Sequence, residues 1–138
     1  FNTRIESALG NARMWAEPIR EGRCVLPVAT FFEPHGSETV PSPRTGRAMK
    51  RQYEFSSSEG EPLLLASVQR KGRLSVVTTE PNTSVAPIHP RMPLVLRFAE
   101  APLWFAGDFA ALAKRPEISL IARPEEANGQ DVSQLSLF

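Results

Sequence analysis

Hydrophobic positions near the start of the chain repeat with the period of an α-helix. Ile5, Ala8, Leu9 and Ala12 are spaced i, i+3, i+4 and i+7, which places them on one face of a helix of about ten residues. Because an interior proline removes a backbone hydrogen bond and clashes with the preceding turn, we expect this helix to end at Pro18. The pattern therefore predicts one short helix ahead of the first strand.

A continuous apolar run predicts the central strand of a sheet. Residues Arg23–Phe32 are mostly apolar or β-branched and lie between Gly22 and Pro34, as in a strand buried on both faces. The next segment, Pro34–Lys50, is rich in Pro, Gly, Ser, Thr and Arg and shows no period. We expect it to be a long mobile loop.

Later segments complete an α+β domain. Short spacers that contain glycine predict an antiparallel meander of three strands, Gln52–Ser57, Leu63–Gln69 and Leu74–Thr79. Four prolines then interrupt the sheet between residues 80 and 93. Beyond them we expect a strand at Leu94–Phe98, a short helix from Asp108 to Lys114 and a last strand at Glu117–Ala122. The sum is one α+β domain, residues 1–124, with mostly antiparallel strands, followed by a polar tail, residues 125–138.

Composition narrows the class of protein. A chain of 138 residues with 41% hydrophobic and 22% charged residues is typical of one folded domain, and its 13 prolines disfavour long helices. The formal net charge is +1, so any surface that binds nucleic acid must be local. The single cysteine, Cys24, excludes an internal disulfide and is typical of a cytoplasmic protein. The longest apolar run, residues 24–32, is too short to span a membrane.

Two residues lie where acid–base chemistry is favoured. Glu33 closes the most apolar run of the chain, where burial would raise its pKa. His89 lies among closely spaced prolines that stiffen its backbone, and imidazole exchanges protons near neutral pH. Each also has a structural interpretation, Glu33 as a carboxylate at a strand exit and His89 as part of a loop that crosses the surface.

Other polar groups are candidates for binding phosphate. Asn2 and Arg4 precede the first predicted helix and can either hold phosphate or sugar oxygens or cap that helix. Four basic residues of the predicted loop have no acidic neighbour and can either contact a phosphate backbone or remain solvated: Arg44, Arg47, Lys50 and Arg51. We place Cys24 in the core as an inert thiol with a raised pKa, and His35 on an exposed loop.

Five segments in this order resemble the SOS response-associated peptidase (SRAP) family, the abasic-site processing proteins. Asn2-Thr3-Arg4-Ile5-Glu6 is similar to the family's Asn-Ala-Arg-x-Glu, and Gly22-Arg23-Cys24-Val25-Leu26-Pro27 to its basic-Cys-x-x-Pro strand. Phe31-Phe32-Glu33 resembles the aromatic-aromatic-Glu element. Thr78-Thr79-Glu80-Pro81-Asn82 and Ile88-His89-Pro90-Arg91-Met92-Pro93 resemble Thr-Thr-x-x-Asn and Ile-His-x-Arg-Met-Pro.

The resemblance implies a barrel-like fold with short peripheral helices and a domain that binds single-stranded DNA at abasic sites and links to it covalently. The family's nucleophile is an N-terminal cysteine, whose amine and thiol attack the sugar aldehyde. Glu33 and His89 would be the catalytic acid–base pair, needing no metal and no organic cofactor. The DNA would be held by Asn2, Arg4, Arg91 and Phe32.

The sequence departs from the family pattern in several places. It begins with Phe1 rather than Met and lacks the N-terminal cysteine segment, so we expect a further segment upstream; the alternative is a shortened relative without the nucleophile. Thr30 replaces a usual glycine, and Pro34-His35 replaces a tryptophan, which affects the surface on which a base would stack.

The last five residues carry a second resemblance, to the pentapeptide with which bacterial repair proteins bind the replication sliding clamp. A groove on a partner would bury the apolar side chains of this segment, or they would pack on their own domain. The clamp-binding residues would be Gln134, Leu135, Leu137 and Phe138. Two functions of other classes stay open beside covalent repair: a peptidase that frees its own N-terminal cysteine, and a non-catalytic module that binds DNA or the clamp.

Overall fold

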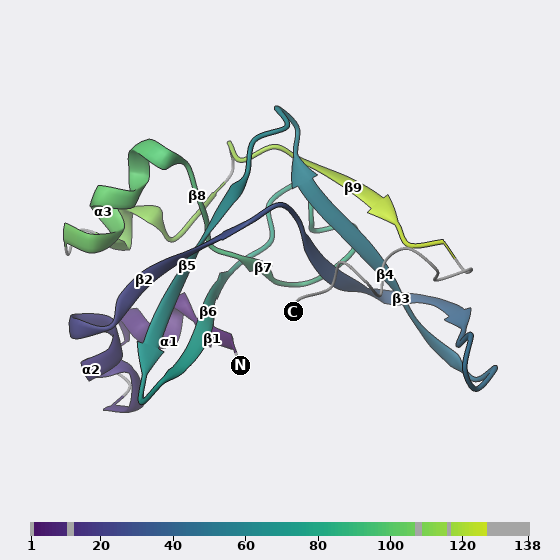
Figure 1. Ribbon diagram of the computed structural model, residues 1–138, viewed down its shortest axis with the longest axis horizontal. Helices are drawn as coiled ribbons and strands as arrows, with labels where there is room; N and C mark the ends of the chain where they lie inside the picture. The colour runs from purple at the N-terminus through teal and green to yellow at the C-terminus, as the bar shows by residue number, and fades with distance from the viewer. Residues whose placement is uncertain (1, 11–12, 107–108, 116, 127–138) are drawn as a thin grey trace.

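A computed structural model describes residues 2–10, 13–106, 109–115 and 117–126, and its strands form two sheets that curl into an incomplete barrel (Figure 1). In the larger sheet β1 runs parallel to β6, and the other strand pairs are antiparallel. Its main path, in spatial order, is β1 (Asn2–Arg4), β6 (Arg73–Thr79), β5 (Leu63–Arg70) and β2 (Arg23–Val28), with β7 (Met92–Pro93) on β6 and β8 (Val95–Leu96) on β5.

The smaller sheet is antiparallel and has the order β3 (Phe31–Pro41), β4 (Ala48–Ser57) and β9 (Leu120–Pro124). The hairpin of β3 and β4 projects away from the larger sheet as an arm (Figure 1). The predicted α+β class with mostly antiparallel strands and short helices is confirmed.

The predicted central strand Arg23–Phe32 is wrong, because the chain bends at residues 29 and 30 and passes from one sheet to the other. Val28 and Phe31 are both buried in one apolar cluster. In a regular strand, residues three apart point to opposite faces, so burying both in one core requires a bend. The first half, β2, lies at the end of the larger sheet's main path, where the exposed Pro27 is tolerated.

The predicted mobile loop at Pro34–Lys50 is also wrong. β3 continues to Pro41 and β4 begins at Ala48, with a short turn between them that contains Gly46 at φ 71°. Most residues at this end of the arm are half-buried or exposed, so neither face imposes an apolar alternation on the sequence. Polar composition therefore concealed a long hairpin.

Of the predicted meander, only one hairpin is confirmed. β5 and β6 pair through a tight turn at Lys71 and Gly72, both with positive φ. β4 pairs with β3 and β9 and not with β5, because Phe55 on β4 and Leu63 on β5 enter the same core from different sheets. The predicted strands Leu94–Phe98 and Glu117–Ala122 correspond to β8 and β9 with different bounds.

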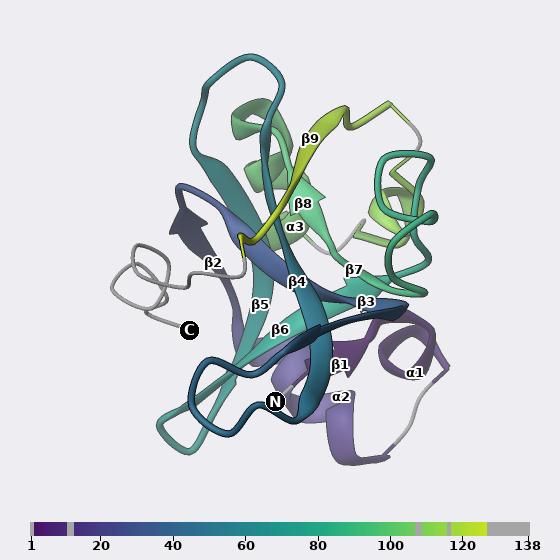
Figure 2. The ribbon, with the colours of Figure 1, turned by 90° about the vertical axis from the view of Figure 1, so that its right-hand side faces the viewer.

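The helices are short and lie on the larger sheet's side of the molecule, α1 and α2 at one end and α3 at the other (Figures 1 and 2). Their bounds are α1 (Ile5–Leu9), α2 (Arg13–Glu21) and α3 (Ala101–Ala106), with 3₁₀ turns η1 (Phe98–Glu100) and η2 (Phe109–Leu112). Pro18 lies inside α2, contrary to the prediction that it ends a helix; its ring is fully buried, and this packing offsets the missing hydrogen bond. The predicted helix from Asp108 to Lys114 is only the 3₁₀ turn η2, and Asp108 itself lies outside the described residues.

Two apolar clusters hold the described chain together. One lies between the helices and the larger sheet and includes the fully buried Trp104, whose indole Nε1 donates to the carbonyl oxygen of Cys24 at 2.8 Å. The other joins the two sheets around Phe55, Val85 and Met92. Within the described chain no helix is both long and apolar enough to cross a membrane.

Candidate functional site

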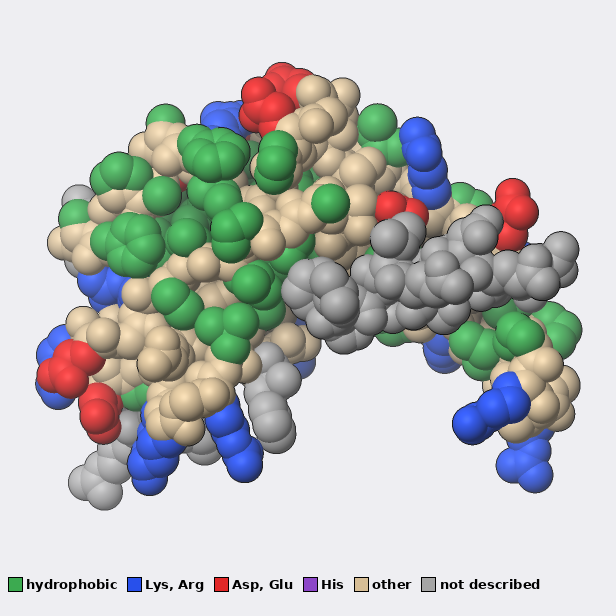
Figure 3. Space-filling model, in the orientation of Figure 1, with side chains coloured by type: hydrophobic (Ala, Val, Ile, Leu, Met, Phe, Trp, Pro, Cys, Tyr) green, Lys and Arg blue, Asp and Glu red, His purple; other side chains and the backbone are tan. Residues whose placement is uncertain are grey.

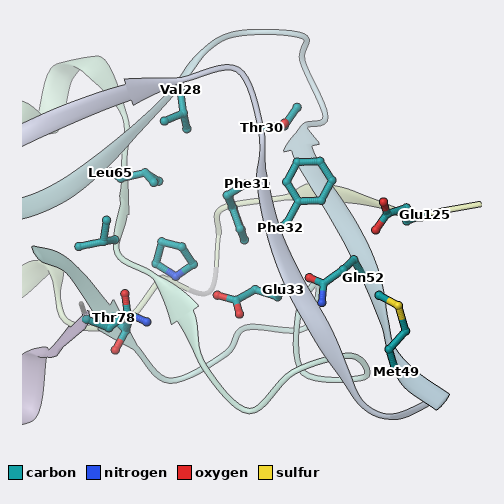
Figure 4. A pocket seen from close by; sticks show the side chains of 13 residues that line it. Val28, Thr30, Phe31, Phe32, Glu33, Met49, Gln52, Leu65, Thr78 and Glu125 are labelled. Carbon is teal, nitrogen blue, oxygen red and sulfur yellow. The ribbon is translucent and has the colours of Figure 1, made fainter. Parts of the chain in front are cut away.

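A cavity of about 540 Å³ is lined by residues of both sheets, chiefly β1 and β6 of the larger sheet and β3 and β4 of the smaller one (Figure 4). It is large enough for a small ligand. Its apolar wall includes Val28, Phe31 and Leu65, and its polar groups include Asn2, Glu33 and Thr78. The remaining lining residues are Thr30, Phe32, Met49, Gln52, Val76, Pro93 and Glu125.

The structure brings Glu33 and His89 together, although 56 positions separate them in the sequence. Glu33 Oε2 lies 3.2 Å from His89 Nε2, and the two side chains are 16% and 23% exposed. Glu33 enters the cavity as the third residue of β3. His89 follows a tight turn in which the backbone N–H groups of Ile88 and His89 donate to the carbonyl oxygen of Val85 at 2.8 and 2.9 Å.

The hydrogen bonds of His89 determine where its protons lie. Nδ1 is 2.8 Å from the carbonyl oxygen of Pro34, which can only accept, so Nδ1 carries a proton. A hydrogen bond between Nε2 and Glu33 then needs one more proton, held either by His89 as imidazolium or by Glu33 as the neutral acid. The pair therefore shares one transferable proton.

Burial raises the pKa of Glu33, and the nearby charge of His89 opposes that rise only in part. A carboxyl group whose pKa lies above its usual range can both accept and return a proton closer to neutral pH. The expectation that burial would raise the pKa of Glu33 is confirmed. Its catalytic role, like that of His89, stays a prediction.

The predicted DNA-binding residues near the N-terminus lie on one face of β1. Asn2 and Arg4 are exposed, whereas Thr3 between them is buried and hydrogen-bonded to Ser75. Asn2 lines the cavity. Phe32 also lines it, but it points to the other side of β3 from Glu33 (Figure 4).

Arg91 is held by groups of the protein itself. Its Nη1 and Nη2 each lie 2.9 Å from a carboxylate oxygen of Glu6, and Nη2 also donates to the carbonyl oxygen and the hydroxyl of Thr78. The hydrogen bond from Arg91 lowers the pKa of Glu6. The contact between Arg91 and a phosphate stays a prediction, and a phosphate would have to compete with Glu6.

The basic residues of the arm differ in exposure and in the contacts that they make. Arg44 and Arg47 are exposed at the turn, whereas Lys50 Nζ donates to the carbonyl oxygen of Gly36 and Arg51 pairs with Glu38. Figure 3 shows Lys and Arg side chains projecting on both sides of the hollow beneath the molecule.

Two further predictions concern residues other than Glu33 and His89. His35 is not on an exposed loop: its side chain is 19% exposed and accepts hydrogen bonds from the backbone. Cys24 is half-buried on β2 and not in the core as predicted, although burial raises the pKa of its thiol as expected. His35 was misplaced because the strand around it was interpreted as a loop.

Gln52 and Glu125 line the cavity but were not singled out from the sequence. Gln52 lies opposite Pro34 in the β3–β4 register, and its carbonyl oxygen accepts from the backbone N–H of Glu125 at 2.8 Å. Only the register brings both beside Phe32, so no sequence signal could have found them. Among the described residues no three His, Cys, Asp or Glu side chains are grouped to hold a metal ion.

The predicted clamp-binding residues lie outside the described residues: Gln134, Leu135, Leu137 and Phe138. The division between a domain of residues 1–124 and a tail also stays a prediction.

The fold is similar to solved structures of bacterial proteins. A protein from Bacteroides thetaiotaomicron matches 99% of this chain with a TM-score of 0.66 and 19% identity. A phage-related protein from Bordetella bronchiseptica matches 91% with a TM-score of 0.68 and 21% identity, and another protein of that organism matches 91% with a TM-score of 0.65 and 19% identity. This chain spans 66%, 63% and 64% of those structures, respectively. No curated protein matches the sequence.

A family model described as SOS response associated peptidase (SRAP) matches residues 1–135, nearly the whole chain. The match includes all five segments on which the resemblance rests, and Asn2 and Glu33 from two of them line the same cavity. The chain belongs to the SOS response associated peptidase family.

Proposed function

We propose that the full-length protein recognises abasic sites in single-stranded DNA and links to them covalently through a cysteine at its N-terminus, upstream of Phe1. The observation that carries this proposal is the contact between Glu33 and His89 beside a cavity of about 540 Å³. A cavity of this volume is large enough to hold a ring-opened sugar.

The shared proton of this pair matches the needs of the reaction. The cysteine amine adds to the C1 aldehyde of the ring-opened sugar, Glu33 takes a proton from the nitrogen, and the His89 imidazolium gives a proton to the aldehyde oxygen, which leaves a carbinolamine. Glu33 then gives its proton to the hydroxyl, which leaves as water, and His89 takes the remaining N–H proton of the protonated Schiff base, so both side chains return to their starting states. The thiol then adds to the C=N carbon while its proton moves to the nitrogen, so a thiazolidine ring closes with the net loss of one water. One residue supplies both nucleophiles to the same carbon, which favours ring closure.

Other cavity residues have separate parts in this proposal. Asn2 contacts the sugar, and the exposed Arg4 on the same face of β1 contacts the adjoining phosphate. Phe32, on the other side of β3, offers a ring for a neighbouring base to stack on. Since the net charge is only +1, DNA binding relies on local cations such as Arg4, Arg44 and Arg47.

The test is denaturing gel electrophoresis of the full-length protein after incubation with a single-stranded oligonucleotide that contains one abasic site. We expect a band of lower mobility that survives denaturation. An oligonucleotide whose abasic aldehyde has been reduced to the alcohol is the matched control and should give no such band, because no C=N bond can form. Replacing the N-terminal cysteine with Ser should abolish the stable product.

A wild-type protein that binds the oligonucleotide but gives no denaturation-resistant band would overturn the proposal and favour a non-catalytic binding module. A band that forms equally with the reduced control would also contradict it, because the linkage would then not involve the aldehyde.

A further inference from the structure

The strand that carries Glu33 contains an irregular segment directly after the candidate site. Pro34 lies opposite Gln52, and Thr39 lies opposite Lys50, so β3 advances five residues while β4 advances only two. The extra residues form a bulge between Pro34 and Thr39 that is larger than the usual bulge of one extra residue. A bulge changes the direction of the neighbouring backbone, so the contacts that fix this bulge also affect the positions of Glu33 and His89.

A polar cluster holds the bulge from two directions. Inside it, His35 Nδ1 accepts the backbone N–H groups of Ser37 at 3.1 Å and Glu38 at 2.9 Å. From β4, the Tyr53 hydroxyl donates to Glu38 Oε2 at 2.9 Å, and Arg51 Nε lies 2.7 Å from Glu38 Oε1. Glu38 therefore joins the bulge to two side chains of the neighbouring strand, and Lys50 Nζ of that strand adds a hydrogen bond to the carbonyl oxygen of Gly36.

The same bulge makes two contacts with the segment that carries His89. The backbone N–H of Gly36 donates to the carbonyl oxygen of Ile88 at 2.8 Å. The carbonyl oxygen of Pro34 accepts from His89 Nδ1, also at 2.8 Å. These contacts hold the imidazole so that Nε2 points to Glu33.

We propose that Glu38 is a positioning residue for the Glu33–His89 pair: through Tyr53 and Arg51 it holds the bulge in which the Pro34 carbonyl keeps a proton on His89 Nδ1. Glu38 acts through the backbone and touches neither reacting atom. The expected effect of Glu38 on the reaction rate rests on the proposed function. The expected effect of Glu38 on the proton of His89 Nδ1 does not.

The two histidines of the chain make this inference measurable. Nδ1 of His35 accepts two N–H groups and is therefore unprotonated, whereas Nδ1 of His89 donates and is protonated. NMR of the DNA-free full-length protein labelled with ¹⁵N-histidine should show opposite states for the two Nδ1 atoms. The His89→Asn variant assigns the signals, because the signals that disappear from its spectrum belong to His89.

The decisive variant is Glu38→Ala. We expect the His89 Nδ1 signal to shift toward the unprotonated range as Pro34 loses its fixed position, and crosslinking to slow by about 10- to 100-fold. Glu38→Gln keeps an acceptor oxygen for Tyr53 and should restore most of both effects. Tyr53→Phe removes only one hydroxyl and should hardly disturb the fold. A shift of the His89 Nδ1 signal in the same direction as in Glu38→Ala, but smaller, would support the proposal.

The matched control is Glu100→Ala, which removes a carboxylate from an ion pair with Arg115 outside the cavity lining. It should leave both His89 nitrogen signals at their wild-type values. Unchanged His89 signals in folded Glu38→Ala and Tyr53→Phe would overturn the positioning role. Shifted signals in a protein that never crosslinks to DNA would support the positioning role and contradict the proposed function, so the two failures are distinguishable.

Discussion

Two half-buried carboxylates of this protein, Glu33 and Glu100, each face a basic side chain, yet their pKa values move in opposite directions. Burial raises the pKa of Glu33, and His89 opposes it only in part. Burial also acts to raise the pKa of Glu100, but hydrogen bonds from Arg115 and from the backbone N–H of Arg97, together with their charges, lower it overall. At Glu100 the hydrogen bonds and the two arginine charges together outweigh burial, whereas at Glu33 burial outweighs the charge of His89.

The difference separates a carboxylate that can exchange a proton from one that stabilises the fold. Glu33 has one side-chain partner and lines a cavity, so its protonated form remains accessible. Glu100 joins the η1 turn to Arg115, whose side chain is almost fully buried. Three experiments can break or sharpen this comparison.

The largest expected effect is the loss of crosslinking in Glu33→Gln. Gln has the shape of Glu but cannot accept the amine proton, so the crosslinking rate should fall by about 10²- to 10⁴-fold, measured on denaturing gels. Glu100→Gln is the matched control and should retain the wild-type rate per folded molecule. Equal losses in the two variants would remove the functional distinction between these carboxylates.

The second effect is on stability. Arg115→Met leaves Glu100 without its buried partner and should lower the free energy of unfolding by about 3–5 kcal/mol, measured by urea denaturation. His89→Asn should cost less, because Glu33 can take up a proton when its partner is lost. A larger loss for His89→Asn would show that the cavity pair is the main structural contact.

The smallest effect is a difference in pH dependence. The pKa of Glu33 is higher in the folded protein than in the unfolded chain, so its stabilising contribution is fully present at pH values below the unfolded pKa. This contribution is lost as the pH rises through the folded pKa. The lowered pKa of Glu100 gives a contribution that is present above the unfolded value and lost as the pH falls through the folded one.

The measurement is urea denaturation between about pH 3 and pH 8 for wild type, Glu33→Gln and Glu100→Gln. From acid to neutral pH, the wild type should lose stability relative to Glu33→Gln and gain it relative to Glu100→Gln. Slopes of the same sign would contradict the assigned directions of the two pKa values.

Sequence reasoning singled out Glu33 and His89, which the structure brings together, and misplaced much of the backbone around them. Glu33 and His89 could be found because one follows an apolar run and the other lies among prolines. The bulge at Pro34–Thr39 could not, because its polar residues satisfy one another and leave no periodic signal. The partner of Arg91 was missed for a related reason, since Glu6 lies 85 positions away.

The amino-acid sequence determined by itself which chemical groups are present, that the strands would be mostly antiparallel, and that the helices would be short. These properties follow from composition and from local apolar patterns. Only the tertiary structure decided that the run Arg23–Phe32 bends between two sheets and that the carbonyl oxygen of Pro34 accepts a hydrogen bond from Nδ1 of His89, which keeps a proton on that nitrogen. An apolar pattern records that a side chain is buried but not which sheet covers it, and a proton on imidazole depends on a partner brought near only by folding.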